Sequence, residues 1–335
     1  MKNIVQGSLI TTFRCNAKCG MCDIYKHPTK KEEEISPKYY EKLPDGMRIN
    51  ITGGEATIRE DIGEIFKIVH PKASLLELST NGFYTDKIVN LAEKYPDILI
   101  RVSLEGLPEK NDKLRGTLNG FDHALRTMLE LKKTKCKNIG FSIVISDQNV
   151  DDLIYLYDLC TYLGVELGNS VMHNSWYFHK TDNGIENQKK AVEMEYEFIK
   201  SLLSSKRKGF KNILKDYGRA YFNKSIYRRF KGETKNYRPQ CGALNDFFFI
   251  DPWGNVSPCN GSAEEWIIGN IKTEKFNDIM NSEKAKNAYE KIKSCKRDCC
   301  FIVTERHDMV RKPWKPLFWV LKNKLKIALN KKLEI

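Results

Sequence analysis

The sequence contains no stretch that approaches the roughly 18 consecutive apolar residues of a membrane-spanning helix, although 41% of its 335 residues are hydrophobic. Its start does not resemble a signal peptide, because Met1 and Lys2 lead directly into a strand-like stretch, Ile4–Phe13, that contains Gln6 and Gly7. Internal repeats and low-complexity segments are absent as well. We therefore expect a cytoplasmic protein with one large domain, or with a main domain and a smaller one.

Excess charge of one sign is also scarce over most of the chain. The formal net charge is +13, but residues 311–335 hold eight Lys or Arg and one acidic residue, so +7 of it lies at the C-terminal end. The modest remainder is not the footprint of a dedicated nucleic-acid binder, and no RNA-binding module is visible. A nucleic acid is therefore not an expected partner, which weakens an RNA-modifying function.

Cysteine is the residue that the sequence does have in unusual number. There are ten, and clustered cysteines in a reducing compartment bind metal or act in catalysis more often than they form disulfides. Two of them, Cys136 and Cys160, stand alone, and we interpret them as small buried hydrophobes. The other eight form two groups, which are Cys15, Cys19 and Cys22 near the start and Cys241, Cys259, Cys295, Cys299 and Cys300 near the end.

Short β-rich apolar runs alternate with helix-like segments through the first half of the chain. Six such units predict an α/β fold with a parallel sheet and right-handed crossovers, closed as a partial (β/α)6 barrel like that of triosephosphate isomerase. In such barrels the chemistry lies at the carboxyl ends of the strands. The strand candidates are Gly7–Thr12, Arg48–Thr52, Leu75–Ser79, Leu99–Leu104, Gly140–Ile145 and Val165–Asn169. The helix candidates are Asp61–Val69, Lys87–Tyr95, Phe121–Lys132 and Val150–Leu163.

The rest of the chain has a different pattern. Residues 187–230 are helical, charged and aromatic without a strand signal, and a second unit opens near Tyr237. There, Phe247–Asp251 and Val256–Cys259 flank a Pro-Trp-Gly-Asn turn and predict a hairpin, while Thr273–Lys293 predicts one helix. We predict four parts, which are a barrel core at 1–186, a helical connector at 187–236, a small auxiliary domain at 237–308 and a basic amphipathic tail at 309–335.

The first cysteine group follows the first strand candidate directly. Three thiolates at the spacing C-x3-C-x2-C, Cys15, Cys19 and Cys22, can bind three irons of a [4Fe–4S] cluster and leave the fourth iron open. An open iron suits a cluster that holds a ligand instead of only carrying electrons. The alternative is a zinc knuckle, but a structural zinc site takes four protein ligands, and only His27 lies nearby in the sequence.

This loop resembles the signature of the radical S-adenosylmethionine (SAM) superfamily, and the resemblance extends over nearly the whole chain. It implies that the amino and carboxylate groups of SAM chelate the open iron. It also implies that an electron from the cluster breaks a carbon–sulfur bond, which gives methionine and a 5′-deoxyadenosyl radical. The family usually has an aromatic residue just before the third cysteine, where this sequence has Met21.

Further motifs resemble those of the family at successive strand ends. Gly53, Gly54 and Glu55 end the second strand candidate and resemble the GGE motif, which contacts the amino group of the cofactor. Glycines allow the backbone to approach a ligand closely. The family often has Pro next, where this sequence has Ala56. Asn81, in a Ser-Thr-Asn-Gly string at the end of the third strand candidate, resembles the TNG turn of the family.

The fourth strand candidate ends at Ser103, in a string similar to the S-x-D-G pattern of the family with Glu105 in place of Asp. Ser103 is therefore a candidate cofactor contact. Arg115 resembles an arginine that family members place near the cofactor carboxylate. Each motif alone is typical of a simple turn, but four in register, one for each successive strand end, indicate this superfamily.

The second cysteine group resembles a SPASM or twitch domain, the auxiliary-cluster module of many radical SAM enzymes. Twelve residues separate Cys241 from Gly254, and four more separate Gly254 from Cys259. Full SPASM domains bind a pair of clusters with more cysteines than this group has, so we expect one auxiliary [4Fe–4S] cluster. A zinc ribbon-like site is the alternative. The expected ligands are Cys241, Cys259, Cys295 and Cys299, with Cys300 able to replace either of the last two.

The C-terminal segment predicts an amphipathic helix with basic residues on its polar side. One interpretation is a contact with an anionic membrane surface, at the inner face of the membrane. The other is a helix packed on the barrel with solvated lysines. The predicted apolar face consists of Leu317, Phe318, Val320, Leu321, Leu325, Ala328 and Leu329, with Lys322, Asn323, Lys326 and Asn330 opposite.

The resemblance implies hydrogen abstraction from an unactivated C–H bond, followed by dehydrogenation, epimerisation, cross-linking or rearrangement. We favour a carbohydrate or lipid-linked small molecule as substrate, because the chain begins at the barrel without a peptide-binding extension. The alternative is the maturation of a ribosomally made peptide, with a leader-binding domain on a separate chain. An alternative of another class is a non-catalytic iron–sulfur or zinc scaffold or electron carrier, against which the GGE and Ser103 matches argue.

Two further expectations concern partners. Reduction of the cluster requires an electron donor, typically an acidic flavodoxin or ferredoxin, which a positive patch would attract. None of the six histidines forms a metal-like pair, and His173 and His179 either line a substrate cavity or have structural roles.

Overall fold

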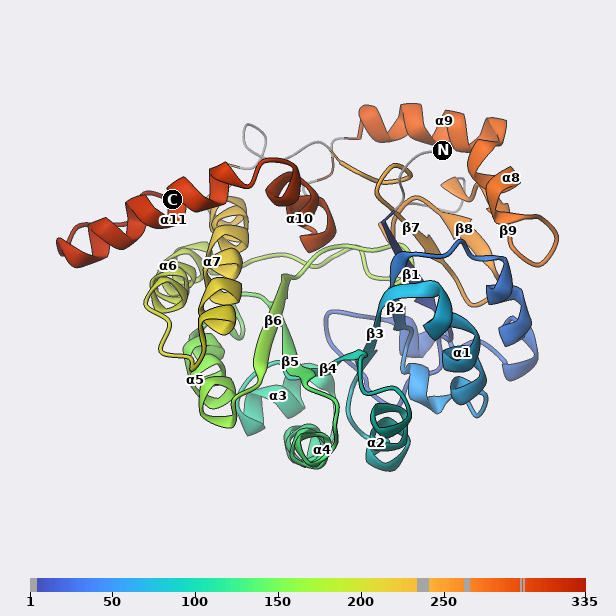
Figure 1. Ribbon diagram of the computed structural model, residues 1–335, viewed down its shortest axis with the longest axis horizontal. Helices are drawn as coiled ribbons and strands as arrows, with labels where there is room; N and C mark the ends of the chain where they lie inside the picture. Colours follow the sequence, from blue (N-terminus) through green and yellow to red (C-terminus); the bar gives the residue numbers. More distant parts are fainter. Residues whose placement is uncertain (1–4, 234–240, 262–265, 296, 298) are drawn as a thin grey trace. The chain divides into compact units, whose positions relative to one another are not determined.

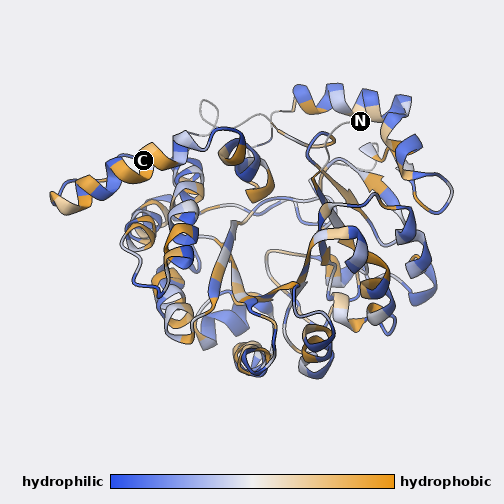
Figure 2. Ribbon diagram, in the orientation of Figure 1, coloured by the Kyte–Doolittle hydropathy of each residue, from blue (hydrophilic) through white to orange (hydrophobic). Residues whose placement is uncertain are grey.

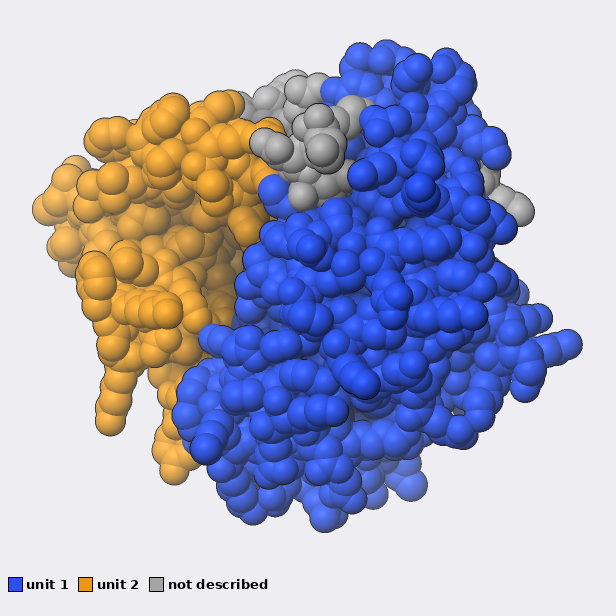
Figure 3. All heavy atoms as spheres, turned by 45° about the vertical axis from the view of Figure 1, so that its right-hand side comes forward, with its two compact units in different colours: residues 1–142, 174–183, 242–295 blue, residues 143–173, 184–241, 296–335 orange. Residues whose placement is uncertain are grey.

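The computed structural model describes residues 5–233, 241–261, 266–295, 297 and 299–335 (Figure 1). The chain forms two compact units, coloured separately in Figure 3. The predicted part boundaries remain predictions, and the predicted opening near Tyr237 lies outside the described residues. Unit 1 consists of residues 1–142, 174–183 and 242–295, and unit 2 of residues 143–173, 184–241 and 296–335.

The main element is a sheet with the strand order β6-β5-β4-β3-β2-β1-β7-β8-β9. Strands β1 to β5 pair with one another as parallel neighbours in sequence order. With the helices that follow these strands, this arrangement confirms the predicted α/β fold with a partial barrel. The first six strands are β1 (Gln6–Ile10), β2 (Met47–Thr52), β3 (Ala73–Thr80), β4 (Leu99–Ser103), β5 (Asn138–Ile145) and β6 (Glu166–Val171).

The predicted barrel helices are present. In α1, the buried residues Ile62, Ile65, Phe66 and Val69 recur at helical spacing and give the helix one apolar face. The helix α3 (Pro108–Arg115) was not predicted, because its buried residues are Asn111 and Arg115 instead of an apolar stripe. The four predicted helices are α1 (Ile62–Val69), α2 (Thr85–Lys94), α4 (Gly120–Lys133) and α5 (Leu153–Leu163).

The two faces of the sheet in unit 1 differ in polarity, because successive side chains of a strand point to opposite faces. One face is buried and mostly apolar. On the opposite face, Arg48 pairs with Glu77, and Ser79 donates a hydrogen bond to Asn50 (3.0 Å). The sequence analysis did not predict this polar face. The apolar face includes Leu9, Ile49, Ile51, Leu76, Leu78, Ile100, Val102 and Phe141.

The auxiliary segment of unit 1 extends the same sheet. The predicted hairpin is confirmed as the antiparallel pair β7 (Phe247–Ile250) and β8 (Asn255–Ser257), and β7 also pairs in parallel with β1. A short β9 (Gly269–Asn270) follows. The single predicted helix Thr273–Lys293 is wrong. Two helices are present, α8 (Phe276–Asn281) and α9 (Glu283–Lys293), because the Ser282 hydroxyl caps α9 by accepting a bond from the Ala285 amide (3.1 Å).

In unit 2, helix α11 (Trp314–Ala328) packs on α6 (Gln188–Leu203) and α7 (Phe210–Phe230), and α10 (Ile302–Arg311) also contacts α7. Asn323, on the predicted polar side of the helix, does not face solvent. Its side chain is fully buried and bonds to the backbone of Trp319 and Glu334. Among the described residues, no helix is both long enough and apolar enough to cross a membrane.

Candidate functional site

The first cysteine loop lies between β1 and a short 3₁₀ turn at Ile24–Lys26, where a barrel would otherwise place its first helix. Its three thiols are partly buried. Within the loop, the amide of Cys22 donates to the carbonyl of Cys19 (3.1 Å), and the Ala17 amide donates to the Cys15 sulfur (3.4 Å). These bonds fold the loop so that its sulfurs belong to one compact turn.

The end of α3 holds this loop from one side. The amides of Lys18 and Gly20 donate to the carbonyls of Arg115 and Leu114, both at 2.9 Å. Gly116 ends the helix at φ +56°, and a Cβ at this position would collide with the Lys18 carbonyl. Only glycine combines this left-handed backbone with so close an approach.

The glycines of the GGE motif hold the loop from the other side. The Gly54 amide donates to the Thr12 carbonyl (2.7 Å), and the Glu55 amide donates to the Arg14 carbonyl (2.9 Å). A Cβ at Gly53 would lie 2.7 Å from the Thr12 carbonyl oxygen, and one at Gly54 would collide with that of Arg14. In this structure the glycines therefore admit the strand that leads to Cys15, a role that the motif alone did not indicate.

Glu55 and Asn81 connect two strand ends to the loop. The Glu55 carboxylate is 1% exposed and accepts hydrogen bonds from the Thr57 amide (3.1 Å), the Thr80 hydroxyl (2.8 Å) and the Asn81 amide (2.6 Å). The Asn81 side chain donates to Asn16 in the cysteine loop (2.6 Å). The Glu55 carboxylate therefore ties the chain after β2 to the end of β3 and is occupied within the protein.

Arg115 contacts Glu105, which follows Ser103 by two residues at the end of β4. Arg115 is buried and donates from Nη1 to Glu105 (3.1 Å), while its Nε is buried without a hydrogen-bond partner in the described part of the chain. An unpaired buried donor costs about 1–3 kcal/mol, so it marks a position where a ligand acceptor fits. Ser103 ends β4 in register with Ser142 of β5 and is only partly buried.

Burial governs the protonation of the three thiols. It raises the pKa of Cys15 to about 11 and that of Cys22 to about 12, and it also raises the pKa of Cys19. Iron cations reverse this balance because they stabilise thiolates. Among the described residues, no three His, Cys, Asp or Glu side chains converge as a single metal ion requires. A cluster does not require this, since each thiolate binds a different iron, and the set therefore fits a [4Fe–4S] cluster.

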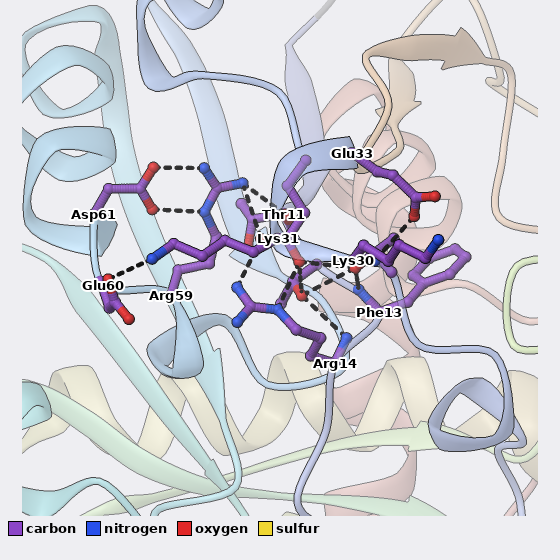
Figure 4. Close-up of polar contacts among 12 residues, drawn as sticks. Thr11, Phe13, Arg14, Lys30, Lys31, Glu33, Arg59, Glu60 and Asp61 are labelled. Carbon is purple, nitrogen blue, oxygen red and sulfur yellow. Dashed lines mark hydrogen bonds and ion pairs between the residues drawn. The ribbon is translucent and has the colours of Figure 1, made fainter.

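A charged network supports the chain just before the cysteine loop (Figure 4). The carboxylate of Glu34 is 2% exposed and accepts a hydrogen bond from Arg14 Nε (2.9 Å). Arg59 donates to the Thr11 carbonyl (2.8 Å) and forms a two-bonded pair with Asp61. Sequence reasoning missed these residues, because only the tertiary fold brings such widely spaced charges together.

The segment 174–183, which follows β6, contacts the first cysteine loop within unit 1. The Asp23 amide donates to the Phe178 carbonyl (2.8 Å), and the Asn183 side chain donates to the Met21 carbonyl (3.1 Å). Aromatic side chains of this segment also pack on the apolar cluster that includes Cys15 and Cys22. The segment thus holds the end of the loop that contains the third cysteine.

The same segment contacts the chain around Cys259. The Ser175 hydroxyl donates to the Asn260 carbonyl (2.6 Å), and the Tyr177 hydroxyl donates to Ser257 (2.9 Å). Both partners lie within two residues of Cys259. One short segment therefore contacts residues beside both cysteine groups, and the aromatic run near His179 was its only signal in the sequence.

The histidines and the second cysteine group are distributed over both units. His173 is partly buried in unit 2, where desolvation lowers its pKa to about 4, and His179 stacks on His27 in unit 1 (4.1 Å between ring centroids).

Of the second cysteine group, Cys259 and Cys295 belong to unit 1, and Cys241, Cys299 and Cys300 to unit 2. The predicted ligand set of the auxiliary cluster therefore remains a prediction.

Comparison with known sequences places this arrangement in a family. The sequence profile of the radical SAM superfamily matches residues 9–160, and that of the SPASM iron–sulfur cluster-binding domain matches residues 241–300. The chain therefore contains a radical SAM domain and a SPASM domain. The predicted cofactors, SAM and iron–sulfur clusters, are thereby confirmed, and the zinc alternatives have no support.

Individual relatives refine this assignment. Fe-coproporphyrin III synthase of Methanosarcina barkeri is 33% identical over 157 residues, which are 44% of this chain and 39% of that protein. The subtilosin biosynthesis protein AlbA of Bacillus subtilis is 24% identical over 289 residues, which are 81% of this chain and 58% of that protein. The chain spans only 39% to 41% of the length of the first five curated relatives that it matches.

A solved structure shares the fold. Streptococcus suis SuiB bound to its precursor peptide SuiA superposes with a TM-score of 0.66 at 16% identity, over 91% of this chain and 71% of that one. At this identity the similarity establishes the fold alone.

Proposed function

We propose that this chain is a radical SAM enzyme that modifies a peptide. The similarity to AlbA carries the proposal, because it extends over 81% of the chain, and that protein is named for the biosynthesis of an antilisterial bacteriocin. The shared fold of SuiB, whose structure contains a precursor peptide, agrees with it. The peptide alternative therefore replaces a carbohydrate or lipid-linked small molecule as the favoured substrate class.

The polar face of the sheet in unit 1 is compatible with this substrate. Arg48, Asn50 and Glu77 carry hydrogen-bond donors and acceptors on two adjacent strands of this face. A peptide presents such groups at every residue, whereas an acyl chain presents none. This face does not separate a peptide from a sugar, so the choice between these two rests on the relatives.

In this proposal Cys15, Cys19 and Cys22 hold a [4Fe–4S] cluster, whose open iron binds SAM. When bound, these groups supply the one-electron cleavage of a carbon–sulfur bond that starts radical chemistry. The buried Nε of Arg115 donates to the cofactor carboxylate, which satisfies the donor that has no partner in the described chain. The other proposed cofactor-binding positions are Gly53, Gly54, Glu55, Asn81 and Ser103.

The SPASM domain is proposed to hold one auxiliary [4Fe–4S] cluster through Cys241, Cys259, Cys295 and Cys299, with Cys300 as the substitute for either of the last two. With four cysteine ligands it relays electrons, and with three it binds substrate. An acidic flavodoxin or ferredoxin is the proposed electron donor, attracted by the net positive charge of the chain. A location in the cytoplasm, peripheral to the membrane, belongs to the same proposal.

The test begins with anaerobic reconstitution, reduction by dithionite, addition of SAM and measurement of 5′-deoxyadenosine. We expect the wild type to form it and the Cys15/Cys19/Cys22→Ala variant to form none while retaining the iron of the auxiliary cluster. The Cys136→Ala variant is the control, because that buried thiol lies outside both cysteine groups. A wild type that binds iron but never cleaves SAM would leave the scaffold or carrier alternative in its place.

The substrate class requires a second measurement. Short peptides encoded beside the gene are incubated with the reduced enzyme, and their masses are compared with those from the triple variant. A mass change that needs the three cysteines supports peptide modification. If no peptide changes, and a sugar instead increases the formation of 5′-deoxyadenosine, the carbohydrate alternative replaces it.

A further inference from the structure

Helix α11 is anchored in unit 2 through one of its faces. Trp319 packs edge-on against Tyr221 of α7, with 5.6 Å between ring centroids. Lys324 Nζ donates to the Tyr217 hydroxyl (2.7 Å). Asn323, which lies between Trp319 and Lys324 in the sequence, is fully buried. These contacts fix the rotation of the helix about its axis, and therefore which side chains it turns to solvent.

The opposite face of α11 is apolar and exposed, and Figure 2 shows apolar and polar residues in alternation along the helix. At 100° per residue, the six side chains concerned cover about 120° of the helix surface. They are six of the fifteen large exposed hydrophobic residues in the described chain, and proteins usually expose such residues singly. This exposed stripe consists of Trp314, Leu317, Phe318, Leu321, Leu325 and Leu329, each 53% to 66% exposed.

Basic residues flank the exposed stripe. By helical geometry, Lys315, Lys322 and Lys326 lie along one edge, while Lys324 on the other edge is held by Tyr217. Glu334 pairs with Lys322 (2.7 Å) and Lys326 (3.0 Å), but exposed pairs of this kind are weak in water and easily exchanged. Since this end of the chain has eight basic residues and one acidic residue, its net charge remains strongly positive.

We propose that the exposed stripe of α11 docks on an anionic lipid surface. Trp314, Phe318 and the leucines enter the boundary between headgroups and acyl chains, and the flanking lysines meet lipid phosphates. The helix lies in the plane of the surface, because no described helix is long and apolar enough to span a membrane. The proposal is independent of the proposed peptide substrate.

Lipid fits these observations better than a protein groove does. A groove that accepts a helix recognises apolar anchors at helical spacing and has no need of a row of lysines beside them. A lipid surface needs both, since apolar insertion supplies binding energy and anionic headgroups attract the lysines. The charge complementarity therefore selects an anionic bilayer.

The experiment is co-sedimentation of the full-length reconstituted protein with vesicles of phosphatidylglycerol and phosphatidylcholine, compared with phosphatidylcholine alone. We expect binding to the anionic vesicles that weakens with added salt. The Leu317→Ser/Phe318→Ser/Leu321→Ser variant should bind about tenfold more weakly or worse. Its side chains are exposed, so the circular dichroism spectrum should not change.

Two further variants are compared. The first tests whether any exposed apolar side chain would cause binding, and the second tests the contribution of positive charge. The Leu118→Ser/Tyr162→Ser variant removes side chains that are 82% and 89% exposed elsewhere on the chain, and it should bind like the wild type. The Lys331→Gln/Lys332→Gln variant leaves the apolar stripe intact and should lose affinity for anionic vesicles by about tenfold.

Three outcomes would overturn the proposal. One is equal sedimentation with anionic and neutral vesicles. Another is undiminished binding by the stripe variant. The third is a wild-type dimer in analytical ultracentrifugation, in the absence of lipid, that the stripe variant does not form. A second copy of this chain would then be the occupant of the stripe.

Discussion

The two cysteine groups differ in how the protein prepares them. The first group occupies a single loop inside unit 1, which backbone hydrogen bonds attach to α3, to the GGE glycines and to the segment 174–183. The second group is spread over sixty residues, from Cys241 to Cys300, and its members belong to both units. Cys241 is exposed, whereas Cys300 is buried.

This difference indicates that the first site is formed before metal binds, whereas the second depends more on the metal for its order. The first loop obtains its shape from contacts that do not involve its sulfurs, so a cluster would bind to a turn that is already formed. A site whose ligands come from distant parts of a chain gains more of its order from the metal itself.

Gly54→Ala should abolish the preorganisation of the first loop. The added Cβ collides with the Arg14 carbonyl, so the strand that leads to Cys15 must move although every cysteine is present. A displacement of this size at a reacting centre costs about a hundredfold or more in rate, measured as 5′-deoxyadenosine formation. Gly63→Ala in α1, where a Cβ meets nothing within 4 Å, is the matched control and should retain full activity. Equal activity of both variants would mean that the loop is not preformed.

Cys259→Ala should remove the auxiliary cluster while leaving the first loop intact. We expect about half of the iron to be lost, with SAM cleavage reduced much less than in Gly54→Ala, because the contacts of the first loop remain. Iron and sulfide analysis together with electron paramagnetic resonance checks this. Complete loss of both clusters would show that the first loop depends on the second group, contrary to the contrast drawn above.

Arg115→Gln should weaken SAM binding and also destabilise the protein. The Glu105 carboxylate would lose its buried partner, at a cost of about 1–3 kcal/mol in the free energy of unfolding. The double variant Arg115→Gln/Glu105→Gln should recover most of that stability but not the affinity for SAM, measured by equilibrium dialysis. Recovery of both would assign Arg115 a structural role only.

Tyr177→Phe should have a mild effect on the contact between the segment 174–183 and the chain around Cys259. It removes the hydrogen bond to Ser257 beside Cys259, worth about 0.5–1.5 kcal/mol, and leaves the ring packing unchanged. We expect a shift in the spectrum or reduction potential of the auxiliary cluster and no change in that of the first cluster. A shift confined to the first cluster would contradict this assignment.

Glu195→Gln should leave both cysteine groups and SAM cleavage unaffected. Glu195 in α6 is fully buried, and neither carboxylate oxygen has a hydrogen-bond partner among the described residues. Burial raises the pKa of this carboxyl well above its ordinary value of 4.5, so the folded protein keeps a proton that the unfolded chain releases. Stability from this group is therefore present at low pH and is lost as the pH rises above 4.5. The melting temperature of the variant should exceed that of the wild type by more at pH 8 than at pH 5, and a constant difference would contradict the assignment.

Local sequence patterns predicted much of the barrel. Alternation in β2 and helical spacing in α1 are properties of adjacent residues, so each element was recognisable without its neighbours. The break at Ser282 was missed, because a capping serine inside a long helical pattern is a weak signal compared with the periodicity around it. Helix α3 was missed for the opposite reason, since its buried residues are polar.

Three features can be recognised in the sequence without the fold, because each is a local pattern. They are the cysteine spacing, the glycines at the strand ends and the alternation of strands and helices. Long-range packing, in contrast, brings β7 beside β1, Glu34 to the chain before the cysteine loop, and the segment 174–183 to both cysteine regions. It also decided which face of α11 is buried. These outcomes depend on which distant surfaces can be buried together, and that competition involves the whole chain at once.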